Sequence, residues 1–258
     1  MHKKHYLLII LITFLFGSSY PVGKIIFNNS VPPLLMGSLR MLIVFLCLLP
    51  FATITIPEKK YWLPLLGFGI SMGFATNVFL NYSIYVAEVL SPTIIGTQLS
   101  IPFGILLSSF FLKEKVSNIK WFLIFLIFIG ILIIGFDPGL QNEKLALLLA
   151  TFMSVFYGGS QVFSITFEGN IKDNIININF TSWILIAHSA IFISIVSHMS
   201  LFYLYKIYTV QKVFPFYSLF PIFGILQTMI IFNQIPTLMI LIGGLIIISS
   251  IYLLNKLG

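Results

Sequence analysis

Polar side chains inside long apolar runs are the residues of this chain that could do chemistry. Arg40 lies about seven residues into one such run, ~10 Å along a helix with a rise of ~1.5 Å per residue. Because a charge at mid-membrane costs ~2.5–3.5 kcal/mol on insertion scales, such a residue usually faces a cavity. A guanidinium there could bind the anionic group of a small molecule. Alternatively, it could pair helices or extend to the membrane surface.

A second group of polar residues follows in the next apolar runs. Asn77 and Asn81 share a helix face, Tyr82 adjoins them, and Gln98 lies one turn before Pro102. Together they could form a polar wall of a path for a small molecule. The alternative is hydrogen bonding between helices, worth only ~0.6 kcal/mol for each bond.

Further candidates for the same path are Ser19, Tyr157, Gln161, His188, Tyr205 and Tyr217. The spacing of His188 and His198 on one predicted helix does not favour a shared metal site. Proton transfer by a histidine stays open beside simple packing. Pro102 and Pro221 occupy matching positions in the two halves, and they are candidate hinges or else static kinks that pack the bundle.

Signatures of enzymatic chemistry are missing from the sequence. Gly23 and Lys24 lack the spacing of a phosphate-binding loop, and Ile25 stands where that loop has Ser or Thr. The single cysteine, Cys47, can form no internal disulfide. The sequence therefore predicts no enzyme, no cofactor and no metal site. Transport driven by a gradient, or by the solute's own concentration, is the activity that these observations leave.

The elements that position the polar residues are membrane-spanning helices. Of the 258 residues, 59% are hydrophobic and only 8% are charged, whereas an ordinary soluble domain has about 25% charged residues. Continuous apolar runs of ~20 residues predict an all-α polytopic transmembrane bundle. The runs fall at about 6–27, 33–52, 61–80, 89–111, 119–136, 144–166, 180–205, 213–232 and 236–254. The net charge of +7 fits lysines in cytoplasmic loops and needs no nucleic acid partner.

The chain repeats itself. Residues 79–92 and 202–215 share aromatic and proline positions at an offset of 123, whereas Phe16 and Tyr157 match at an offset of 141. Because a loss of ~20 residues equals one transmembrane helix, the first half is predicted to hold five helices and the second half four. The predicted units are a first repeat at residues 1–138 and a shortened second repeat at residues 139–258.

Loop charges predict the orientation of the two halves. Lysines at 3–4, 59–60 and 113–120 are all cytoplasmic if the N-terminus is inside, and the bias reverses in the second half, as in an inverted-topology repeat. Nine crossings conflict with a cytoplasmic position for Lys206 and Lys256. Three alternatives stay open: the last spans insert against their charge bias, the 144–179 segment is not a simple crossing, or a helix has been lost.

Several motifs together resemble one family. They are the G-S-S-Y-P-V at Gly17–Val22, Arg40, the paired tyrosines before Pro92, the run Ile101–Lys115, Trp121 and Gly130. These residues are similar to the EamA group of the drug/metabolite transporter superfamily, across nearly the whole chain.

The resemblance implies a two-repeat carrier of the inner (plasma) membrane with an EamA-like transporter fold. It implies a small-molecule substrate, such as an amino acid or a related solute, that is exported rather than imported. The lipid bilayer is the other expected partner, and a homodimer is left open. The alternative is a non-transporting remnant or an accessory membrane subunit, because one helix is missing.

Overall fold

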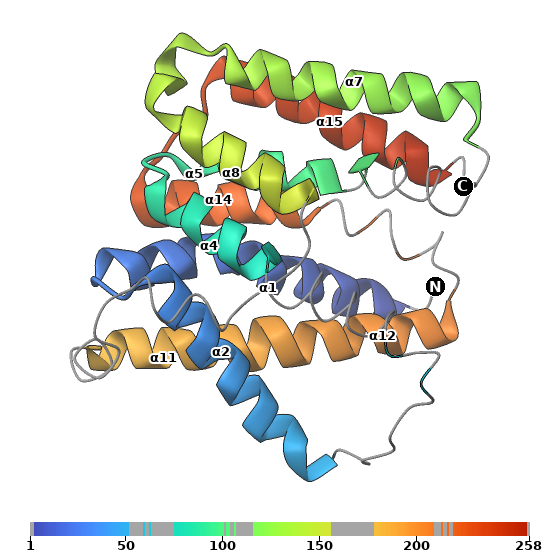
Figure 1. The fold of residues 1–258 in the computed structure, drawn as a ribbon. Coiled ribbons are helices and arrows are strands. Elements are labelled where there is room, and N and C mark those ends of the chain that lie inside the picture. Colours follow the sequence, from blue (N-terminus) through green and yellow to red (C-terminus); the bar gives the residue numbers. More distant parts are fainter. Residues whose placement is uncertain are drawn as a thin grey trace.

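The chain is a bundle of helices (Figure 1). The computed structural model describes residues 3–51, 59, 62, 75–100, 102–103, 106, 116–155, 178–208, 213, 216 and 219–256. The α-helices are α1 (Lys3–Asn28), α2 (Pro33–Leu48), α4 (Thr76–Val86), α5 (Leu90–Gly96), α7 (Asn118–Gly135), α8 (Lys144–Val155), α11 (Phe180–His188), α12 (His198–Ile207), α14 (Phe220–Phe232) and α15 (Leu238–Lys256). The 3-10 turns are η1 (Leu49–Phe51), η4 (Thr97–Leu99) and η5 (Pro138–Glu143), and the π-helical segment η6 (Ser189–Ser197) joins α11 to α12. The all-α architecture predicted from composition is confirmed.

Several helix ends follow from local residue types. Pro33 opens α2, where its fixed φ suits the first turn. Asn179 caps α11 because its side chain accepts a hydrogen bond from the backbone N–H of Ser182 at 2.7 Å. α14 stops at Asn233, whose φ of 53° lies in the left-handed region that asparagine tolerates.

The connections gather at one end of the bundle, here called the loop end (residues 29–32, 87–89, 136–143, 178–179 and 233–237). Asn29 donates to the hydroxyl of Ser182 at 3.1 Å across this end. At the opposite end, here called the terminal end, His5 Nδ1 lies 2.7 Å from the hydroxyl of Tyr208. α1 begins and α15 ends at the terminal end (Figure 1).

The two halves run in opposite directions. In the first half α1, α4 and α7 run toward the loop end and α5 runs away from it. In the second half α8, α11–α12 and α15 run away from the loop end and α14 runs toward it (Figure 1). Each of these first-half helices is therefore antiparallel to its counterpart in the second half, as expected for the inverted type of repeat, and α2 has no described counterpart.

α8 and α11 are parallel, because both begin at the loop end (Figure 1). This course brings Lys206 and Lys256, near the ends of α12 and α15, to the terminal end together with Lys3 and Lys4. The charges thus agree with the helix directions. This shared position favours a cytoplasmic placement of Lys206 and Lys256, which stays a prediction.

Helix packing has the same twofold pattern. α1 packs against α14 and the α11–α12 rod, while its counterpart α8 packs against α5 and α4. α7 and α15 pair with each other. Gly130 and Gly243 let these last two helices touch, because a Cβ on Gly243 would lie 2.6 Å from the carbonyl oxygen of Gly130.

The outer surface is apolar, as a lipid environment requires. Four described stretches are long and apolar enough to cross a membrane: Lys3–Asn28, Pro33–Phe51, Asn118–Gly135 and Phe180–Leu201. Large side chains such as Phe125 and Leu245 are exposed on the outside of the bundle. Buried polar residues therefore stand out as the exceptions to be explained.

Candidate functional site

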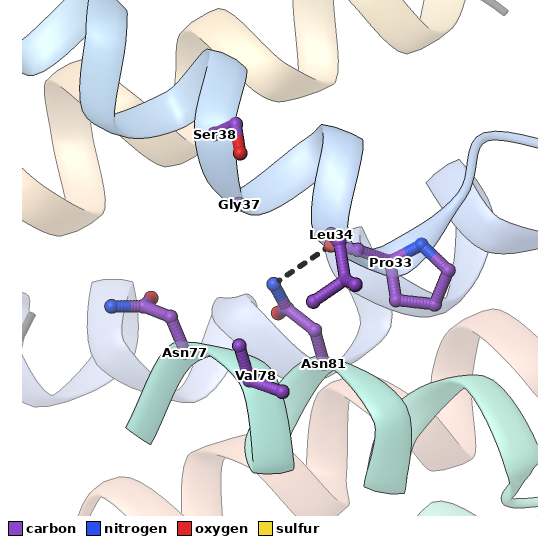
Figure 2. Close-up of a pocket in the computed structure, with 7 residues that line it drawn as sticks. All are labelled: Pro33, Leu34, Gly37, Ser38, Asn77, Val78 and Asn81. Carbon is purple, nitrogen blue, oxygen red and sulfur yellow. Dashed lines mark hydrogen bonds between the residues drawn. The ribbon is translucent and has the colours of Figure 1, made fainter. Parts of the chain in front are cut away.

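A small pocket lies between α2 and α4 (Figure 2). The residues that line it are Pro33, Leu34, Gly37, Ser38, Asn77, Val78 and Asn81. Asn81 is buried, and its Nδ2 donates to the carbonyl oxygen of Pro33 at 3.2 Å. Asn77 lies one turn away on the same side of α4, and the two asparagines predicted to share a face do so toward α2 (Figure 2).

Gly37 sets the width of this pocket, because a Cβ there would lie 3.1 Å from Asn81 Nδ2. The pocket volume is about 10 Å³, on a measure in which a single water molecule needs ~10–15 Å³. The space fits a water molecule and not a metabolite. A solute could pass here only if α2 and α4 moved apart.

Arg40 lies on α2 one turn beyond the pocket and contacts the second half of the chain. The residue is 9% exposed, and its Nε donates to Ser194 Oγ of η6 at 2.7 Å. Ser194 in turn donates to the carbonyl oxygen of Ser189 at 3.2 Å. The hydroxyl of Ser194, in the second half, thus accepts a hydrogen bond from the guanidinium of Arg40, in the first half.

The π-helical geometry of η6 supplies that hydroxyl. Ser194 and Ser197 both donate to carbonyl oxygens five residues earlier, Ser197 to Phe192 at 2.8 Å. His198 follows, edge-on to the ring of Phe16 with 4.9 Å between centroids, and it is close enough to Arg40 for their charges to interact. Stretches of π-helix are frequent at functional sites.

Another polar contact joins α1 to η4. The hydroxyls of Tyr20 and Thr97 are 2.8 Å apart, and the Tyr20 ring stacks on Phe220 of α14 with 6.3 Å between centroids. Gln98, beside Thr97, is buried, and its Oε1 has no hydrogen-bond partner among the residues that the structure describes. This contact brings α1, η4 and α14, from both halves, together around polar groups.

At the loop end a buried carboxylate, that of Glu143, joins η5 to the connection between α4 and α5. Glu143 accepts hydrogen bonds from the backbone N–H groups of Val89 at 2.7 Å and Glu88 at 3.0 Å. Burial raises the pKa of Glu143; the Glu88 charge acts in the same direction, whereas the two N–H donors and the Lys24 charge oppose it. Lys24 itself donates to the carbonyl oxygen of Ala87. The connection between α4 and α5 is therefore clamped by groups from α1 and η5.

The structure does not assemble the predicted polar wall as one surface. Asn77 and Asn81 line the pocket, but Tyr82 lies edge-on to Tyr85 with 6.4 Å between centroids, and Gln98 lies on η4, which packs against α8.

The other predicted residues are dispersed. Ser19 donates to the carbonyl oxygen of Phe16 on its own helix at 2.7 Å, and His188 lies against Phe192 with 5.3 Å between ring centroids. The residues Tyr157, Gln161 and Tyr217, and the side chain of Tyr205, lie outside the described part of the chain.

The two candidate hinges differ in their helical context. Pro102 is buried in a helical turn. Pro221 lies in the first turn of α14, where a proline breaks no hydrogen bond within the helix. Whether Pro221 acts as a hinge or as a static kink therefore stays a prediction.

Among the contributors that were not predicted from the sequence are Ser194, Thr97 and Glu143. Ser194 and Thr97 are small hydroxyl residues in apolar runs, and this is the signal that could have drawn attention to them. Glu143 gave no such signal, because its sequence neighbourhood is that of an ordinary polar loop.

Comparisons with known proteins agree with this inverted bundle. The model of the EamA-like transporter family matches residues 3–136 and residues 140–256. A solved crystal structure of a protein aligns over 97% of this chain and 96% of its own, with 13% sequence identity and a TM-score of 0.52, which shows the fold alone. The comparison with curated proteins found no match.

The apolar helices and the match to the family model identify a polytopic helical membrane protein of the transporter class. The chain belongs to the EamA-like transporter family, within the drug/metabolite transporter superfamily.

Proposed function

We propose that this protein is a secondary transporter that moves a small metabolite, such as an amino acid or a related solute, along a path between two repeats at residues 1–138 and 139–258. The observation that carries the proposal is the contact between Arg40 of the first half and Ser194 of the second, a partly buried hydrogen bond of 2.7 Å in an apolar bundle. Charges are kept inside membrane helices mainly where they serve a solute path. No catalytic step is part of the proposal.

The pocket between α2 and α4 supports the same path. Its polar lining from Ser38, Asn77 and Asn81 is closed to about the size of one water molecule. In an alternating-access cycle the two repeats rock against each other, and the path opens to one side at a time. The described structure corresponds to a state in which this part of the path is narrow.

The charge distribution supports an orientation with the N-terminus in the cytoplasm of the inner membrane. Lys3, Lys4, Lys120 and Lys206 all lie at the terminal end. The described acids Glu88, Asp137 and Glu143 lie at the loop end. Lysines collect in cytoplasmic loops, so the terminal end faces the cytoplasm in this proposal. Export as the direction rests on the family resemblance.

The test is flux from reconstituted vesicles loaded with ¹⁴C-labelled amino acids. Wild-type protein should release at least one of them, Asn81→Leu should block the release by filling the pocket, and Leu245→Ala on the exposed lipid face should leave it unchanged. Absence of flux for every solute from a well-folded protein would support the alternative, a non-transporting remnant or accessory subunit.

A further inference from the structure

Arg40 uses one of its five guanidinium donors in a hydrogen bond to the part of the chain that the structure describes. A guanidinium has five N–H donors, and only Nε has a partner among the described residues, the hydroxyl of Ser194. The residue is 9% exposed, and neither terminal nitrogen is among the fully buried atoms that lack a partner, so both nitrogens stay accessible at the edge of the described structure. The edge of the guanidinium that carries the two terminal nitrogens can therefore donate hydrogen bonds to another group.

No described carboxylate neutralises this charge. Glu143 holds backbone N–H groups at the loop end, and Asp137 accepts from Gly139 at 2.9 Å and from the hydroxyl of Thr237. Arg40 forms no ion pair with them. Burying a cation without a counter-charge costs desolvation free energy, and the binding of an anion offsets that cost.

The surroundings of Arg40 favour an anion in one orientation. Ser194 occupies Nε and is itself fixed by its bond to Ser189, so the guanidinium cannot rotate freely. The fixed fork of two terminal nitrogens matches the spacing of two oxygens in a carboxylate.

We propose that Arg40 binds an oxyanion, the carboxylate of the transported solute, between α2 and η6, and that Ser194 is a positioning residue for the guanidinium. This inference rests on the proposed function for the identity of the ligand. It restricts the substrates to solutes with a free carboxylate, and it explains why a charged residue lies on the contact between the two halves.

The binding test uses acetate and acetamide, which have nearly the same shape and differ in charge. At equal ionic strength, acetate should raise the melting temperature of the purified protein above that in chloride, and acetamide should not. Arg40→Gln should abolish the shift, whereas Arg40→Lys should retain part of it, because lysine keeps the charge without the planar fork. Equal shifts with acetate and acetamide, or an undiminished acetate shift in Arg40→Gln, would overturn the site.

The flux test compares amino acids with their carboxyl amides. Wild-type protein should carry the acids and discriminate against the amides, and Arg40→Gln should lower flux of the acids roughly 10- to 100-fold, the range for hydrogen bonds to a charged group. Ser194→Ala should reduce the preference for acids over amides, and Ser194→Thr should restore it. Ser249→Ala is the matched control, because the Ser249 hydroxyl bonds only to its own helix in α15.

The outcomes separate this inference from the proposed function. If acetate binding depends on Arg40 but no solute shows flux, the oxyanion site at Arg40 is supported and the transport function is refuted. If acids and amides show equal flux, and Arg40→Gln leaves that flux unchanged, the transport function is supported and the oxyanion site is refuted. A lipid phosphate is the other source of an oxyanion: stabilisation by phosphatidylglycerol that needs Arg40, with no effect of acetate, overturns the assignment to a solute.

Discussion

The contact between α7 and α15 yields a quantitative prediction about Gly243. A Cβ at this position would lie 2.6 Å from the carbonyl oxygen of Gly130 and 2.7 Å from Ile134 Cγ1, whereas ordinary contacts begin near 3.4 Å. Gly243→Ala therefore forces the helices apart by about 0.8 Å, the difference between 3.4 and 2.6 Å. A gap of that size forfeits ~25–50% of the dispersion energy of each separated atom pair.

The expected cost is ~1–3 kcal/mol, the usual range for overpacking. For a domain of this size that corresponds to a fall in melting temperature of roughly 2–12 °C. Gly130→Ala should behave similarly, because its Cβ would lie 2.6 Å from Ile247 Cγ1 and 2.9 Å from the Gly243 carbonyl oxygen. The double variant should cost less than the sum, since the helices need to separate only once.

Gly135→Ala is the matched control on α7. Its added Cβ would lie 3.6 Å from Leu147 Cδ2, an ordinary contact, so the melting temperature in detergent should not fall. Equal melting temperatures for Gly243→Ala and Gly135→Ala would refute the close packing of α7 on α15.

Two further predictions concern the loop end and the candidate hinges. Because burial raises the pKa of Glu143, its contribution to stability is complete below the ordinary glutamate value and is lost as the pH rises through the raised one. Glu143→Gln stays neutral, so its melting temperature relative to wild type should increase as the pH rises from below the ordinary glutamate pKa through the raised pKa of Glu143; a constant difference would contradict this. Pro102→Ala and Pro221→Ala should each slow flux several-fold if these prolines are hinges, and unchanged rates in both would discard that role.

Much of the helical architecture was predictable, because it depends on runs of apolar residues. The helix α7 coincides closely with the run expected at 119–136, and the inverted arrangement followed from the charges and the matched motifs. Asn77 and Asn81 were expected on one face from their spacing alone, and the structure places both at one pocket. Local periodicity sufficed for these features.

The remaining features depend on tertiary contacts that no local pattern encodes. In the π-helical segment η6 a backbone N–H bonds to the carbonyl oxygen five residues earlier, whereas in an α-helix the interval is four. The apolar residues around Ser194 give no sign of this change. Glu143 acquires its role only because the 87–89 connection folds over it. The sequence could not show that Asn81 lines the pocket while Gln98 does not. That difference depends on how η4 and α4 each pack against α8.

The most direct test of the central claim, a water-accessible path between the two halves, is labelling of single cysteines in a Cys47→Ala background. Asn81→Cys and Ser194→Cys should react with a charged, membrane-impermeant thiol reagent, although Asn81 is only 4% exposed in the described state. Phe125→Cys and Leu245→Cys, at positions 59% and 69% exposed on the lipid face, should not react, because lipid excludes the reagent. Labelling of the lipid-facing pair, with none at Asn81→Cys or Ser194→Cys, would contradict a path between the repeats.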